Sequence, residues 1–202
     1  MAGLNVSARN AMVDGLAAVT THIALFDATG TELTGGAPAY ARKAVTWTAA
    51  AAGIRDNNAQ LLFDVPAVTV AFHGLMSAIT AGTTHAILPV QGGSPALPMA
   101  WTFLASTDVF TTYAHGFSND QRVVLNDVAT AGLPTGYDET TVYWVVAVAT
   151  DTFQLSATQG GAAVNGTTNG EGFVQRCVPE IFAAQGQYSI ATGALDLDAN
   201  LI

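Results

Sequence analysis

The stretch TVYWVVAVATDTFQLSAT, from Thr141 to Thr158, decides the fold class of this chain. Its first part, Val142 to Val148, is almost entirely β-branched or aromatic, which is typical of a strand in the centre of a sheet. Ala149 to Asp151 break that run. From Phe153 to Thr158 apolar and polar residues then alternate, the period of two that gives a strand one buried face. We predict a β-hairpin, and it supplies no nucleophile, base or set of metal ligands.

Similar patterns predict strands along the rest of the chain. They are expected within residues 22–26, 41–49, 61–63, 68–76, 86–90, 101–104, 110–113, 122–125, 172–178 and 188–190. Pro89 marks an edge strand or a bulge, because proline cannot donate to a sheet ladder. Ser7 is expected to cap one short helix that ends at Val19, since apolar residues there recur at helical spacing.

The chain is expected to form two domains. A jelly-roll-like β-sandwich with the N-terminal helix is predicted for residues 1–106 plus 178–202, and a small β-barrel or sandwich module for residues 107–177. The module is interpreted as an insertion because the sequence after Pro179 again resembles the first part. The alternative is that the last strand belongs to the second domain. Either arrangement is an all-β fold.

Charge is scarce and unevenly distributed. Half of the residues are hydrophobic and 10% are charged, with a formal net charge of −9. A surface with so few charges is typical of a chain packed against copies of itself or other subunits, although a lone acidic domain is the alternative. The net charge is −1 up to Ser106 and −8 from Thr107 onward. Nucleic acid is therefore not expected as a partner, because phosphate binding needs clustered Lys and Arg.

Common catalytic and metal-binding motifs are absent from the sequence. GxGxxG, GxxxxGKS/T, HExxH and GxSxG do not occur. The histidines His22, His73, His85 and His115 are isolated, and only His73 and His85 fall on neighbouring predicted strands. Since a metal needs several converging ligands, we interpret all four as structural. Cys177 is the only cysteine, which excludes an internal disulfide and indicates a small buried side chain.

Three other groups have both a functional and a structural interpretation. Asp196, Asp198 and Asn200 have the first spacings of a calcium loop without its Gly and Glu, so acids on an edge strand fit better. The Asp138–Glu139 pair resembles glycosidase carboxyls, but adjacent residues in an extended chain point to opposite faces. The tryptophans Trp47, Trp101 and Trp144 are expected to fill cores rather than to stack on sugars, with Trp144 buried. We predict no catalytic, cofactor-binding or metal-binding residues.

The N-terminal MAGLNVSARN lacks the basic and apolar regions of a secretory signal. No run approaches 18 apolar residues, so we do not expect a membrane span. We expect the chain to be made in the cytoplasm.

Several segments resemble virion proteins of tailed bacteriophages, chiefly tail fibre or minor tail proteins of phages that infect actinobacteria. The segments are SARNAMVDGLA (7–17), GGAPAYARKAVTW (35–47), FDVP (63–66), VAFHGLMSA (70–78) and FAAQGQYSIATGALDLD (182–198). The inner part is separately similar to a β module that recurs in phage structural proteins. Its segments are AHGFSNDQRVVL (114–125), GLPTGYDETTVYWVV (132–146) and DTFQLSATQGGAAV (151–164). In the similar proteins the first domain is commonly continuous, whereas here the module interrupts it.

This resemblance implies a non-enzymatic virion protein without cofactors. It would form a homo-oligomer, bind other virion proteins through the sandwich and project the module outward, to face solvent, the host surface or another virion protein. A capsid decoration or head-fibre protein is the main alternative, and a carbohydrate-active enzyme of the tail tip is a third hypothesis. The resemblance supplies no catalytic residues.

Overall fold

The computed structural model describes residues 4–91, 98–127 and 132–199. The chain divides into two compact units: unit 1 comprises residues 1–27, 32–88 and 181–202, and unit 2 comprises residues 28–31 and 89–180. Both units consist mainly of strands, and α1 (Val6–Val19) is the single helix among the described residues. The prediction of a mainly β protein with one N-terminal helix is confirmed. None of the described helical structure is long and apolar enough to cross a bilayer.

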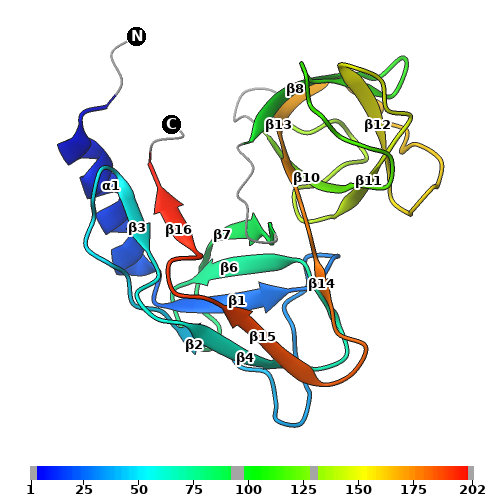
Figure 1. Cartoon of the computed structure of the whole chain (residues 1–202). Helices are drawn as coiled ribbons and strands as arrows, with labels where there is room; N and C mark the ends of the chain where they lie inside the picture. The colour runs from blue at the N-terminus through cyan, green and yellow to red at the C-terminus, as the bar shows by residue number, and fades with distance from the viewer. Residues whose placement is uncertain (1–3, 92–97, 128–131, 200–202) are drawn as a thin grey trace. The chain divides into compact units, whose positions relative to one another are not determined.

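Helix α1 begins two residues earlier than Ser7 would allow. The N-cap is Asn5, which is extended and whose side-chain oxygen accepts a hydrogen bond of 2.8 Å from the Ala8 backbone N–H. Asparagine caps a helix as well as serine does, so the prediction of Ser7 was wrong by half a turn. The helix packs through Val13 and Ala17, beside β3 (Ile54–Asp56) and β16 (Asp196–Asp198) (Figure 1).

Unit 1 contains a four-stranded sheet in the order β2-β1-β6-β7. Its strands are β2 (Lys43–Ala44), β1 (His22–Phe26), β6 (Phe72–Met76) and β7 (Thr84–Pro89). Strand β1 runs antiparallel to β6, and both are buried along almost their whole length. Pro89 ends the edge strand β7, as its missing N–H predicted. The expected strand at 41–49 shrinks to two residues because the chain from Thr46 to Thr48 bonds to residues 56–58 instead.

Three two-stranded ribbons complete unit 1. They pair β4 (Leu61–Val65) with β15 (Gly186–Ile190), β3 with β16, and β5 (Thr69–Val70) with β14 (Glu180–Ile181). Each ribbon joins a strand from the first 70 residues to one near the end of the chain. Tyr188 and Ile190 are buried on one face of β15, which agrees with the alternation in the sequence.

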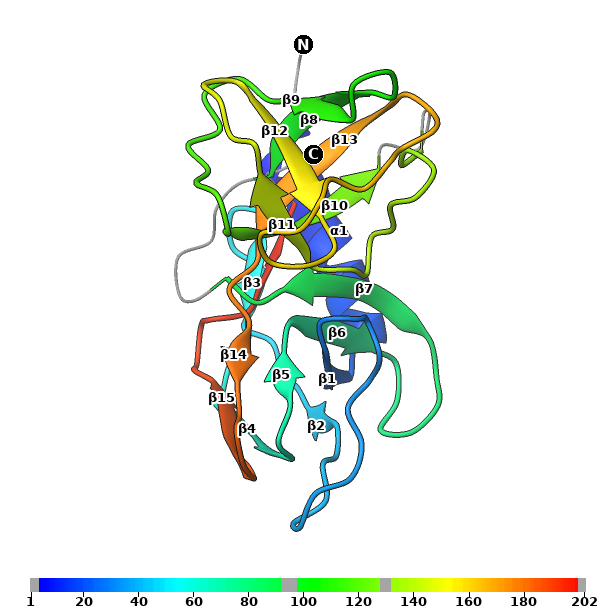
Figure 2. The same ribbon diagram turned by 90° about the vertical axis from the view of Figure 1, so that its right-hand side faces the viewer.

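Unit 2 contains a closed barrel in the order β10-β11-β12-β9-β8-β13. Its strands are β8 (Met99–Leu104), β9 (Val109–Thr111), β10 (Arg122–Asp127), β11 (Tyr143–Val146), β12 (Thr152–Ser156) and β13 (Gly170–Arg176). The predicted hairpin is β11–β12, with Val145 opposite Leu155. Strand β13 closes the barrel by pairing with both β10 and β8 (Figure 2).

The compact barrel unit is longer than the module expected at residues 107–177. Strand β8, which sequence analysis assigned to the first domain, pairs with β9 and β13 and so belongs to the barrel. The unit therefore extends from Pro89 to Glu180. The contrast in charge on either side of Thr107 marks a change in surface composition and not the beginning of this unit.

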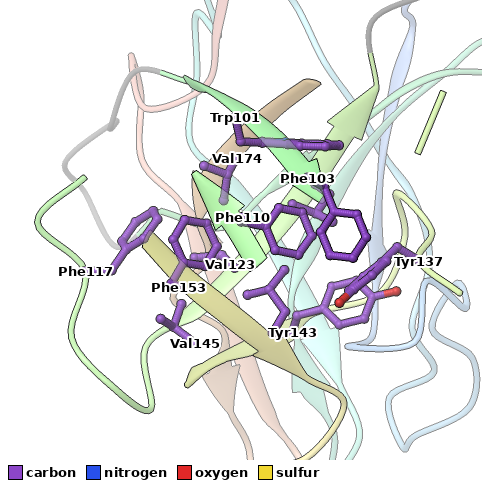
Figure 3. Close-up of a cluster of buried hydrophobic side chains, with 12 residues drawn as sticks. Trp101, Phe103, Phe110, Phe117, Val123, Tyr137, Tyr143, Val145, Phe153 and Val174 are labelled. Carbon is purple, nitrogen blue, oxygen red and sulfur yellow. The ribbon is translucent and has the colours of Figure 1, made fainter. Parts of the chain in front are cut away.

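The barrel interior is filled with aromatic rings (Figure 3). They belong to Trp101, Phe103, Phe110, Phe117, Tyr137, Tyr143 and Phe153, packed with Val123, Val145 and Val174. Gly172 makes room for the backbone carbonyl of Asn126 and for the indole of Trp101, because a Cβ at position 172 would overlap the carbonyl oxygen and lie 2.7 Å from the ring. Trp144 is not in this core. It is half-buried on the outer face of β11, with the guanidinium of Arg122 4.8 Å from its ring centroid, so its predicted burial was wrong.

Candidate functional site

Two of the four histidines, His73 and His115, are buried and form hydrogen bonds inside the units. His73 is buried, and its Nε2 lies 2.6 Å from the hydroxyl of Tyr188; burial lowers the pKa of His73 to about 4. His115 Nδ1 accepts from the Phe117 N–H, which leaves Nε2 to donate to the Ala149 carbonyl. His85 is exposed on β7, next to β6, which carries His73. Within the described residues no cluster of His, Cys, Asp and Glu can hold a metal ion.

The acids Asp138 and Glu139 hold loops together. Asp138 accepts hydrogen bonds from the backbone and hydroxyl of Thr140 and from the hydroxyl of Thr141. Glu139 accepts from the Asp127 N–H at 3.0 Å. Because the two carboxylates are engaged with different segments, they do not converge on a common point where a glycosidic bond would sit.

The acids at the end of the chain face another carboxylate. Asp196 lies directly opposite Asp56 in the β16–β3 ribbon, and Asn200 lies outside the described residues. Partial burial, a hydrogen bond to Asp56 and repulsion from its charge raise the pKa of Asp196 to about 6. The neutral form of Asp196 is favoured because two carboxyl groups face each other across the ribbon. Burial likewise raises the pKa of Cys177 to about 12, which makes it a poor nucleophile.

Helix α1 presents an uncharged outer surface. Ala11, Met12, Gly15, Ala18 and Val19 are all exposed and recur at helical spacing, and we call this stripe the α1 face. The charges on the helix are Arg9, which is half-buried, and Asp14, which pairs with Arg55 at 3.0 Å. A surface helix normally carries polar or charged residues on its solvent side, so the α1 face has the composition of a contact surface.

A groove lies on the outside of the barrel, across β9, β8 and β13. Its volume is about 370 Å³, and we call it the barrel groove. The residues that line it on the solvent side are Ala100, Thr102, Thr111, Tyr113, Glu171 and Phe173. Tyr113 is 87% exposed and Phe173 is 40% exposed, far more than is usual for aromatic residues that fill a core.

The sheet register orders these side chains. Phe173 lies opposite Ala100, and two residues further along β13 Glu171 lies opposite Thr102, which in turn lies opposite Thr111. Tyr113 follows Thr111 by two residues, as Ala100 precedes Thr102 by two. The groove thus has two aromatic walls, the small Ala100 at its floor, and a row with one carboxylate and two hydroxyls.

Two buried residues beneath the barrel groove have unmet hydrogen-bonding capacity. Trp101 and Thr112 both line it, and neither the Trp101 indole N–H nor the Thr112 hydroxyl has a hydrogen-bond partner. Sequence analysis assigned Trp101 to a core and placed Tyr113 and Phe173 in predicted strands, without a binding role for either. The outward position of Glu171 and Phe173 was readable from alternation in β13. Their neighbours on other strands were not.

Comparison of the chain with models of protein families, with curated proteins and with solved structures finds no match.

Proposed function

We propose that this chain is a non-enzymatic structural protein of a bacteriophage virion, a tail fibre or minor tail component. Unit 1 binds neighbouring virion subunits, including copies of the same chain, and unit 2 is presented to a further partner. The segments that resemble phage virion proteins support the class of protein. The uncharged α1 face is the observation that carries the docking role. The jelly-roll-like sandwich predicted for unit 1 stays part of this proposal.

The α1 face suits docking for a physical reason. Met12 and Val19 are 42% and 45% exposed. Covering what remains exposed of each side chain contributes about 1 kcal/mol, roughly half of what full burial provides. Ala11, Gly15 and Ala18 have little or no side chain, so a neighbouring backbone can approach closely. No lysine or glutamate must be desolvated on the α1 face, which keeps the cost of docking low.

Gold-labelled antibodies against the purified chain, applied to intact particles and viewed by electron microscopy, test the location. Label on tails supports the proposal. Label on heads replaces it with the capsid decoration or head-fibre alternative, and particles without label refute a virion role. Incubation with host cell-wall glycan, followed by analysis of released sugars, tests the enzyme hypothesis; sugar release that depends on Asp138 or Glu139 would contradict a purely structural role.

A charged variant of the α1 face tests the docking role. Met12→Lys combined with Val19→Lys should lower the amount of chain in purified particles at least about tenfold, the effect of losing about 1.4 kcal/mol. Leu104→Lys is the matched control, because Leu104 is 50% exposed on the barrel and lies outside the α1 face. Both variants should melt like the wild type. Equal incorporation of the two would show that α1 does not dock.

A further inference from the structure

We propose that the barrel groove binds a neutral saccharide, with one pyranose ring held between Tyr113 and Phe173. This inference rests on the side chains of unit 2 and does not depend on the proposed virion role.

The spacing of the two aromatic walls fits a sugar ring. Phe173 is on β13 and Tyr113 follows β9, with β8 between those strands. Adjacent strands are about 4.8 Å apart, so β13, which carries Phe173, and β9, which leads into Tyr113, are about 9.6 Å apart. A flat ring in van der Waals contact with an aromatic ring on each side needs about 7–8 Å. The apolar C–H faces of a pyranose can therefore contact both rings, and Ala100 leaves the floor open between them.

The neighbouring row of residues suits sugar hydroxyls. Glu171 accepts hydrogen bonds only, while the hydroxyls of Thr102 and Thr111 both donate and accept. All three side chains are exposed on the outer face and lie in register across β13, β8 and β9. A saccharide has hydroxyls that can donate to Glu171 and exchange hydrogen bonds with both threonines, and its C–H faces remain for the aromatic walls. A few polar groups set in an apolar cleft are typical of small-ligand sites.

Charge narrows the class of ligand. Unit 2 carries eight Asp and Glu residues against Arg122 and Arg176, and the groove itself contains Glu171 and no cation. Anionic sugars and phosphates are therefore repelled. A cationic side chain would suit Glu171 but only donates hydrogen bonds, so it cannot accept a hydrogen bond from the hydroxyls of Thr102 and Thr111. A sugar hydroxyl can both donate and accept.

Titration of the full chain, followed by NMR amide shifts, tests the proposal. The probes are neutral tetrasaccharides built from glucose, N-acetylglucosamine, mannose or galactose, each to about 10 mM, which covers the weak affinities of single-ring sites. Tetragalacturonate and tetralysine are the charged comparisons. We expect at least one neutral probe to shift the amides of Thr102, Thr111 and Glu171, and tetragalacturonate to leave them unchanged.

Variants locate the site and identify the chemistry. Tyr113→Ala and Phe173→Ala should each weaken binding at least about fivefold, the contribution of one aromatic contact, without changing the melting temperature by more than Leu104→Ala does. Leu104→Ala, on the same outer face but outside the groove, should bind like the wild type. Glu171→Gln should retain most saccharide binding, because an amide still accepts from a hydroxyl.

Three results would overturn the saccharide site. The first is the absence of binding by every neutral probe. The second is binding of tetralysine alone, abolished in Glu171→Gln, which would make the groove a site for cationic peptides. The third is saccharide binding that persists in both aromatic variants, which would place the sugar elsewhere on the chain.

Discussion

Phe110 is the residue on which the barrel interior depends most. It is fully buried, and its ring centroid lies 5.1 Å from that of Trp101, 4.7 Å from Phe103, 5.2 Å from Tyr137 and 5.4 Å from Phe153. Truncation to alanine removes four aromatic contacts and leaves a cavity among rigid rings that cannot close around it. Because Phe→Ala in a core costs about 3–5 kcal/mol, we expect Phe110→Ala to fall at the upper end.

Trp144→Ala is the informative comparison. Trp144 is a larger residue, but it is half-buried on the outside of the barrel, where it stacks on Arg122. Its loss removes a cation–π contact of about 0.5–1 kcal/mol and part of an apolar contact area, about 1–2 kcal/mol in total. The sequence alone predicts the reverse order, because the Tyr143–Val146 run has the composition of a fully buried strand.

Urea unfolding followed by NMR signals of barrel residues measures both variants without interference from unit 1. Val145 and Leu155, which pair across β11 and β12, are suitable reporters. With a slope of about 1–2 kcal/mol per molar urea, Phe110→Ala should move the midpoint by more than about 2 M and Trp144→Ala by about 1 M. Phe110→Leu, expected to lose about a third as much, serves if the alanine variant does not fold. A Trp144→Ala loss equal to or larger than that of Phe110→Ala would refute the assignment of the core.

Three further predictions concern unit 1. Burial lowers the pKa of His73 to about 4, so between about pH 6.5 and pH 4 the unfolded chain takes up a proton that the folded chain excludes. The free energy of unfolding should therefore be highest above about pH 6.5 and fall by up to about 3 kcal/mol towards pH 4. In urea titrations at several pH values, His73→Gln should remove this pH dependence. Gly74→Ala should lose about 1–3 kcal/mol by thermal melting, since its Cβ would overlap the ring of Phe26, and an unchanged melt would contradict that packing. Because the pKa of Asp196 is raised, the stability that this residue contributes declines as the pH rises from about 4 to 6. Asp196→Asn removes the repulsion from Asp56, so this variant should be more stable than the wild type at pH 7, by less than about 1 kcal/mol after solvent screening, and equally stable at pH 4.

The elements that sequence analysis located correctly are those whose signal is local. The hairpin β11–β12 is specified by two short runs and the break between them, and β1 by four apolar residues after His22, followed by a turn. The helix was found from its periodicity, and the error at its start arose because Asn5 and Ser7 are equally good caps. Local composition could not distinguish the burial of Trp144 from that of Trp101, because both stand in strands rich in apolar residues and only closure of the barrel decides which face is inside.

The barrel groove shows why the rest was out of reach. Its walls come from residues 60 positions apart, Tyr113 and Phe173, and they become neighbours only because β8 pairs with β9 on one edge and with β13 on the other. Moving β13 by one residue relative to β8 would turn Glu171 and Phe173 into the barrel and bring Gly172 to the surface, so the site exists in one register alone. Gly172 helps to fix that register, since a Cβ at this position would overlap both the backbone carbonyl of Asn126 and the indole of Trp101. The residue that shapes the barrel core therefore also holds the two aromatic walls on its outer surface, and Gly172→Ala should disturb both the packing of Trp101 and the binding of any ligand in the groove.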